Sequence, residues 1–167
     1  AFVLAQMAAG KVTVPGSAVQ QDGRSASLTA PNGQAQTDLL IVAHSRARMD
    51  ADSVALHEAH GTGTALGDPS EAGSLVGAVL SSREVPLAVG GVKANIGHAE
   101  PAAGMTGLLK LALGLQRGEA APNAQLRLLN PHVCGVLGGV ACALPVQLAV
   151  AAAGSGGVSS FGYSGTI

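Results

Sequence analysis

The alternation of apolar and polar positions divides the first third of the chain into three parts. Residues 11–20 are rich in β-branched side chains and predict an extended segment, broken at Pro15 and Gly16. The following residues, 21–33, are polar and dense in turn formers, which predicts a loop. Over residues 34–49, leucine, valine and alanine recur at helical spacing and predict a helix with one apolar face.

The middle of the chain repeats the order strand, loop, helix. Residues 53–60 predict a short strand, and a helix is expected over 68–80. A second strand over 86–93 leads into a loop over 94–100. A long helix over 101–118 opens with proline and closes with glycine. Because this last helix has almost no polar face, we expect it to be sandwiched between layers.

This order of elements predicts an α/β fold, in which the chemistry sits in loops at the strand ends. Three glycine-rich loops are expected after strands, at 60–64, 94–98 and 156–165, with the sequences "HGTGT", "ANIGH" and "GGVSSFGYSG". The first two contain His60 and His98. A site, if the chain has one, is therefore expected where these loops meet.

Composition narrows the range of partners. The 167 residues are enough for one domain, only 11% of them are charged, and the formal net charge is −1. No basic stripe stands out, so we expect no nucleic-acid partner. Cys134 and Cys142 lie in apolar sequence and suggest neither a disulfide framework nor a zinc site, which favours a reducing, cytoplasmic location. The chain also starts without methionine, as expected for a piece of a longer protein.

Residues 133–154 carry no charge and are long enough to cross a membrane as a helix. Several glycines, Pro145 and Gln147 interrupt this stretch, and no aromatic or basic residues flank it. We therefore predict buried strands with a loop around Pro145, and no membrane span.

The first two loops contain the candidate chemistry. His60 is followed by Thr62 and Thr64 between glycines, so both hydroxyls can face a narrow ligand along one side of an extended loop. A purely structural hydrogen-bonding role for His60 stays open. His98 either closes a tight loop in which Lys93 pairs with a carboxylate, or provides a second imidazole that converges on His60. A metal would need a third ligand and tighter spacing, so no metal site is predicted.

The other polar residues of these segments have simpler interpretations. Asp68 and Glu71 stand at the spacing of a helix capping box, with Pro69 between them, which predicts a helix start and no catalysis. His57 is interpreted as incidental to the strand, and His132 as part of a turn. The serines of "GVSSFG" do not match the nucleophile motif G-x-S-x-G of hydrolases, and no acid follows to complete a triad.

Five strings of the chain, in order, resemble the β-ketoacyl synthase domains of polyketide synthases. They are "GSAVQQDGRSASLTAPNG", "EAHGTGTALGDPSEA", "GGVKANIGHAEPAAGMTGLLK", "NPHV" and "GVSSFGYSGT". The resemblance implies a thiolase fold, a five-layered α-β-α-β-α sandwich of two similar halves that dimerises. Residues 1–167 would then be a partial domain, the C-terminal half with a short part preceding it.

The resemblance also implies an activity and a partner. In this family a cysteine takes an acyl chain from the phosphopantetheine arm of an acyl carrier protein. A malonyl-type extender on a second carrier arm is then decarboxylated, and its carbanion attacks the acyl thioester. The domain itself would bind no cofactor, because the carrier protein holds the phosphopantetheine.

Site residues follow from the motifs that match. His60 of "HGTGT" and His98 of "NIGH" would donate N–H groups to the enolate oxygen, and Lys93 would order them by its positive charge. Thr62 and Thr64 match the threonines that hydrogen-bond the pantetheine arm.

In the last loop, the resemblance assigns Phe161 and Tyr163 to the substrate site. Tyr163 stands at the position that gates the acyl pocket, and its backbone N–H would join the oxyanion hole.

The match fails at the nucleophile. The family carries its cysteine in a TACSSS-like turn in the N-terminal half, and neither Cys134 nor Cys142 has that context. We therefore expect this chain alone to be inactive, and expect the final strand to be unfinished. Smaller departures from the family pattern occur at Gln21, Ser70, Gly91 and Ile167.

Two alternative functions stay open. The first is a fatty-acid synthase ketosynthase. The second is a non-condensing scaffold that binds acyl carriers or dimerises, and intact His60 and His98 argue against it.

Overall fold

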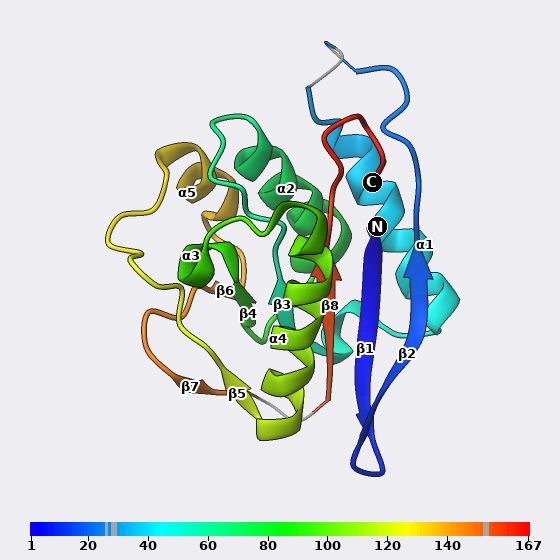
Figure 1. Cartoon of the computed structure of the whole chain (residues 1–167), viewed down its shortest axis with the longest axis vertical. Coiled ribbons are helices and arrows are strands. Elements are labelled where there is room, and N and C mark those ends of the chain that lie inside the picture. The colour runs from blue at the N-terminus through cyan, green and yellow to red at the C-terminus, as the bar shows by residue number, and fades with distance from the viewer. Residues whose placement is uncertain (26, 28–29, 152–153) are drawn as a thin grey trace.

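A six-stranded sheet forms the centre of the computed structural model, which describes residues 1–25, 27, 30–151 and 154–167 (Figure 1). The strand order is β2-β1-β8-β3-β4-β6. Strands β8, β3, β4 and β6 are parallel to one another, and β1 alone runs antiparallel to its two neighbours, β8 and β2. The strands are β1 (Phe2–Ala8), β2 (Lys11–Ala18), β3 (Val54–Glu58), β4 (Leu87–Gly90), β6 (Cys142–Ala143) and β8 (Ser155–Ser159).

Helices cover both faces of this sheet. Helices α1 (Gly33–Ala47) and α2 (Gly67–Leu75) pack on one face, and α4 (Ala103–Arg117) lies across the other (Figure 1). The smaller elements are η1 (Ala51–Ser53), η2 (Val76–Leu80), α3 (Lys93–Ile96), η3 (Glu100–Ala102), β5 (Glu119–Ala120), α5 (Pro131–Leu137) and β7 (Ala149–Val150). The predicted α/β class is confirmed, as are the helices and strands expected between residues 34 and 118, with two changes: 76–80 is a π-helical turn, and Lys93 begins a short helix instead of ending a strand.

Each face of the sheet has its own apolar core, because neighbouring side chains of a strand point to opposite faces. Phe2 and Leu4 of β1 belong to the core beneath α1 and α2, whereas Ala5 belongs to the core beneath α4. Leu111 and Leu115 of α4 fill this second core. Most of the side chains in both cores are leucine, valine and alanine, as the composition indicates.

The strand β8 overturns part of the sequence prediction. Residues 156–159 were expected to be loop, yet Ser155–Ser159 is a fully buried strand in the middle of the sheet, and only 160–165 remains a loop. Two glycines explain this position. A Cβ on Gly156 would collide with Leu111 of α4, and one on Gly157 would lie 2.5 Å from Phe2 Cζ on the opposite face. Glycine thus admits close packing on both sides, although it is a poor strand former.

The N-terminal hairpin also differs from expectation. The sequence did not predict β1, and β2 continues through the proposed break at Pro15 and Gly16. The register shifts there, from Leu4 paired with Gly16 to Gln6 paired with Thr13. Because β2 is an edge strand, Pro15 removes no hydrogen bond from the centre of the sheet. The break is therefore a local bulge inside one strand.

The stretch 131–154 was predicted only in part. Helix α5 replaces the expected turn and first strand, because Asn130 caps it by accepting a hydrogen bond from the His132 N–H at 2.9 Å and Pro131 occupies its first turn. Two short strands, β6 and β7, lie on either side of Pro145 as expected, but they are half-buried to exposed and not buried as the sequence predicted. Within the part of the chain that the structure describes, no helix is long and apolar enough to cross a membrane. Residues 26, 28–29 and 152–153 of the loop and strand predictions lie outside the described residues.

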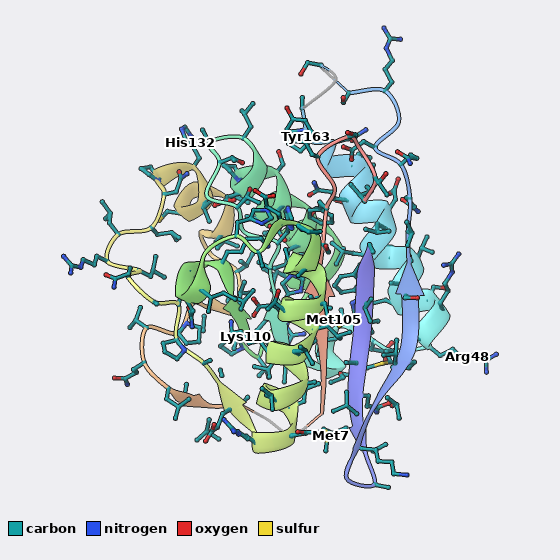
Figure 2. The ribbon with its side chains drawn as sticks, viewed as in Figure 1. Met7, Arg48, Met105, Lys110, His132 and Tyr163 are labelled. Carbon is teal, nitrogen blue, oxygen red and sulfur yellow. The ribbon has the colours of Figure 1, made fainter. Side chains whose placement is uncertain are left out.

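Within the described residues, helix α4 is covered on one face only, whereas the sequence predicted a helix sandwiched between two layers. Its outward face exposes Met105, Leu109 and Leu113, which are spaced one helical turn apart. Figure 2 shows Met105 on the side of α4 turned toward the viewer.

Buried histidines make the stability of the fold sensitive to acid. His57 of β3 stacks on Phe2 at a centroid distance of 5.8 Å, and His44 of α1 stacks on the same ring at 6.0 Å. Burial, and secondarily the charge of His44, lowers the pKa of His57 to about 3 from its ordinary value of 6.5. The unfolded chain therefore binds a proton at pH 3–6.5 that the folded chain does not, so stability is present above pH 6.5 and is lost as the pH falls.

We expect His57→Gln to reduce the pH dependence of stability by about 1.4 kcal/mol per pH unit between pH 6 and pH 4, because glutamine does not titrate. Denaturant unfolding at several pH values measures this slope. His132→Gln, at an exposed position of α5, is the matched control. An unchanged slope in His57→Gln would show that His57 does not account for the acid sensitivity.

Candidate active site

Three loops meet at one edge of the sheet, because β8, β3 and β4 are parallel neighbours and their carboxyl ends point the same way. His60 follows β3, His98 lies beyond β4, and Phe161 follows β8. The His60 and His98 rings are 6.0 Å apart between centroids and nearly perpendicular, at 88°. The Phe161 ring packs against the His60 ring, with their centroids 5.4 Å apart. The structure thus brings the two imidazoles together, as the second of the two sequence interpretations of His98 requires.

Hydrogen bonds define which ring nitrogen of each histidine carries its proton. His98 Nδ1 accepts a hydrogen bond from the Glu100 backbone N–H at 2.8 Å, so we assign the proton of the neutral ring to Nε2. His60 Nδ1 faces two donors, Lys93 Nζ and the Phe161 N–H, each at 3.4 Å. The same tautomer follows for His60. Both rings therefore offer an Nε2–H donor.

The charge state of His60 agrees with this assignment. Burial, followed by the charges of Lys93, His98 and the chain's amino terminus, lowers the pKa of His60 to about 4. His60 is therefore neutral at physiological pH. Lys93 donates a hydrogen bond to the His60 carbonyl oxygen. Burial lowers the pKa of Lys93, while the nearby carboxylates of Glu71, Glu58 and Asp68 oppose that shift.

The capping-box prediction for the next helix is wrong. Helix α2 begins at Gly67, and its N-cap residue Leu66 makes no side-chain cap. Asp68 Oδ1 instead accepts from the Gly63 N–H at 3.1 Å. Both acids lie on the side of α2 over which the "HGTGT" loop folds back, so they bind that loop and not their own helix end.

Of the two acids, Glu71 binds the loop through more hydrogen bonds than Asp68. Its carboxylate accepts from two successive backbone groups, the His60 N–H at 2.7 Å and the Gly61 N–H at 2.9 Å. The side chain is buried, and burial raises its pKa to about 7, although the two N–H donors lower it. Glu71 therefore fixes the turn on which the His60 ring stands.

Thr62 and Thr64 point to the same side of the loop, with their Oγ1 atoms 3.4 Å apart. Thr64 Oγ1 also accepts from the Gly67 N–H at 3.1 Å and so closes the start of α2. Thr62 is half-buried, whereas Thr64 is exposed. The two hydroxyls thus differ: Thr64 stabilises the helix start, and Thr62 is the better placed of the two to bind a ligand.

Tyr163 does not join the other predicted residues. Its side chain is 85% exposed and lies at the outer end of the last loop, as Figure 2 shows. Its role as a gate therefore stays a prediction. Cys142 also lies apart from the site, because it pairs with Leu87 at the opposite end of β4, and Cys134 is exposed on α5.

Asn123 is a positioning residue that the sequence interpretation missed. It is buried, and its Oδ1 accepts from the Gly91 N–H at 2.8 Å while its Nδ2 donates to the Val89 carbonyl at 3.0 Å. It therefore fixes the backbone just before Lys93. These partners lie 32 and 34 residues away along the chain, so no local pattern marks Asn123. Among the described residues, no cluster of three His, Cys, Asp or Glu side chains could hold a metal ion.

Residues 12–127 match the family described as β-ketoacyl synthase, C-terminal domain. This match covers more than half of the chain. The chain belongs to the β-ketoacyl synthase family. The sequence resemblance is therefore confirmed, and two of the three converging loops, at 60–64 and 94–98, lie within the matched residues.

Relatives of known name agree with this assignment. The chain is 44% identical over 156 residues to a phenolphthiocerol/phthiocerol polyketide synthase protein of Mycobacterium tuberculosis, covering 90% of this chain and 8% of that protein. It is also 44% identical over 158 residues to an erythronolide synthase of Saccharopolyspora erythraea, covering 92% of this chain and 5% of that protein. The chain thus spans less than a tenth of these relatives.

Solved structures confirm the fold. An oxazolomycin ketosynthase domain from Streptomyces albus matches with a TM-score of 0.84 and 34% identity, over 93% of this chain and 29% of that one. Ketosynthase twelve of the bacillaene polyketide synthase from Bacillus amyloliquefaciens matches with a TM-score of 0.82 and 30% identity, with the same coverage of both chains.

Proposed function

We propose that this chain forms part of the condensing site of a polyketide synthase, with residues 1–167 as a partial ketosynthase domain. The complete domain would extend a carrier-bound acyl chain by decarboxylative Claisen condensation with a malonyl-type extender. The observation that carries this proposal is the pair of imidazole rings, 6.0 Å apart between centroids, whose Nδ1 atoms each face a backbone N–H donor, so that both Nε2 atoms are left to donate to a ligand. We further propose a homodimer in the cytoplasm, with acyl carrier protein as the partner.

The proposed mechanism assigns each residue one task. When the malonyl thioester loses CO2, the electron pair of the broken C–C bond moves into an enolate, whose charge gathers on the thioester oxygen. The Nε2–H groups of His60 and His98 donate to that oxygen, and one such donor is worth about 3 kcal/mol. The enolate carbon then attacks the acyl thioester carbonyl, a C–C bond forms, and the C–S bond breaks to return the cysteine thiolate. That cysteine would lie in sequence outside this chain.

Lys93 and the threonines act around this centre. Burial, and after it the positive charge of Lys93, lowers the pKa of His60 and keeps its ring neutral, with Nδ1 as acceptor. Thr62 and Thr64 would hold the phosphopantetheine arm, which carries the substrate and is no cofactor of this domain. Phe161 packs against His60 and would limit the movement of that ring, while Tyr163 would gate the acyl pocket.

An assay of the complete domain that contains this chain tests the proposal. With malonyl carrier protein we expect CO2 release, and with an acylated cysteine we expect a β-ketoacyl product. Residues 1–167 alone are expected to give no condensation product. A complete domain that binds acyl carrier protein but releases no CO2 would instead be a scaffold.

Thr62→Val is expected to raise the KM for malonyl carrier protein about fivefold and leave kcat unchanged. The hydroxyl would bind the arm equally in the ground and transition states, and one hydrogen bond is worth about 1 kcal/mol. Steady-state kinetics of CO2 release measures both constants. Thr62→Ser, which keeps the hydroxyl, is the control and should retain the wild-type KM. A fall in kcat with constant KM would assign Thr62 to the chemical step instead.

A further inference from the structure

A buried ion pair lies behind the proposed site, on the side of the sheet that α4 covers. Glu58 is the last residue of β3, and its Oε2 accepts from Lys110 Nζ of α4 at 2.6 Å. The side chains are 4% and 18% exposed. The second oxygen, Oε1, accepts from the Val92 backbone N–H. One carboxylate therefore joins the end of β3, the segment after β4, and α4, and Figure 2 shows Lys110 on that helix.

Two glycines provide the space for this pair. A Cβ on Gly90 of β4 would lie 2.7 Å from Lys110 Nζ and 3.1 Å from Glu58 Oε2. A Cβ on Gly107 of α4 would lie 3.3 Å from Glu58 Cγ. Both strand and helix thus lack a side chain where the ion pair passes between them. The pair is built into the packing of α4 on the sheet.

The contacts of Glu58 lead directly to the catalytic groups. Val92, whose N–H it binds, precedes Lys93, and Lys93 donates to the His60 carbonyl and lies 3.4 Å from His60 Nδ1. Glu58 also stands two residues before His60 on the same strand end. A shift of the carboxylate would therefore move Lys93 and His60 relative to each other.

We propose that Glu58 and Lys110 are positioning residues for decarboxylation, which hold Lys93 and His60 in register through the Val92 N–H. This inference rests on the proposed function of the site. A buried ion pair is often no more stabilising than apolar residues of the same volume, so stability alone is a weak reason for it. Positioning is a stronger one, because a displacement of about 1 Å at a catalytic group costs on the order of 10²-fold in rate.

Three variants of the complete ketosynthase domain test the proposal. Glu58→Gln and Lys110→Met each leave one unpaired charge, and each is expected to lower kcat for malonyl decarboxylation about 10- to 100-fold, with KM within about twofold and cysteine acylation within about threefold of wild type. The double variant leaves no unpaired charge and keeps an acceptor for the Val92 N–H, so its kcat is expected to return to within about fivefold of wild type. Arg117→Met, an exposed site on the same helix, is the control.

The outcomes separate positioning from stability. Wild-type decarboxylation in both single variants would overturn the proposal, as would equal losses in both half-reactions together with a lowered Tm. Should a single variant not fold, Glu58→Asp decides, because it keeps the charge and withdraws the carboxylate: reduced decarboxylation with normal acylation supports positioning, and wild-type decarboxylation refutes it. A wild-type domain without any decarboxylation overturns the proposed function, and the ion-pair inference falls with it, whereas normal decarboxylation in the single variants overturns the inference alone.

Discussion

Replacing His98 with alanine in the complete ketosynthase domain is expected to lower malonyl decarboxylation about 10²–10³-fold. The His98 Nδ1 is occupied by the Glu100 N–H, so the Nε2–H is the group that would meet the enolate oxygen. Alanine has no such donor, so the charge that gathers on the enolate oxygen in the transition state is less well stabilised. Release of CO2 from malonyl carrier protein, measured under saturating substrate, reports the loss in kcat.

The same variant should still acylate its cysteine, because the proposed donor acts only on the enolate. His98→Gln offers an amide N–H and is expected to recover part of the lost rate. His132→Ala, at an exposed histidine on α5, is the control for the loss of an imidazole far from the strand ends. Normal decarboxylation in His98→Ala would refute the donor role.

Glu71→Ala is expected to have the second largest effect, on both stability and catalysis. The change leaves the His60 and Gly61 N–H groups without their acceptor, which costs about 3 kcal/mol of unfolding free energy for two unsatisfied donors. The turn that bears the His60 ring then loses its fixed position, and we expect decarboxylation to fall about 10²-fold. Denaturant unfolding and CO2 release give the two numbers.

Glu71→Gln separates the charge of this residue from its hydrogen bonds. Because the folded pKa is raised to about 7 from 4.5, Glu71 adds stability below pH 4.5 that is lost as the pH rises through 7. Glutamine should remove that dependence while keeping one acceptor for the turn. Glu84→Ala, an exposed acid, is the control. Equal stability of Glu71→Ala and Glu84→Ala would show that the turn does not depend on this carboxylate.

The sequence predicted those parts of the site that local strings encode. His60, Thr62 and His98 stand in loops after strands with clear patterns, so their meeting at one sheet edge followed from the parallel order of the strands. Glu71 was misinterpreted, because its spacing from Asp68 is that of a capping box, while its actual partners lie 10 and 11 residues away.

Contacts between residues far apart in the chain could not be predicted from a single sequence. The strand β8 is made of serine, glycine and valine, and its position depends on Phe2 and Leu111, which fill the space beside its glycines. The roles of Glu58 and Asn123 likewise depend on partners more than 30 residues distant. Local propensity contains no information on such contacts.

The close packing of Leu111 against Gly156 has a consequence for engineering of hybrid synthases. A recombination junction placed between α4 and β8 would combine a helix from one parent with a strand from another. Any parent with a larger residue at the position of Gly156 would then force the helix outward, and with it Lys110. Hybrids should therefore inherit these two elements as one block, with the crossover point placed before residue 103 or after residue 159.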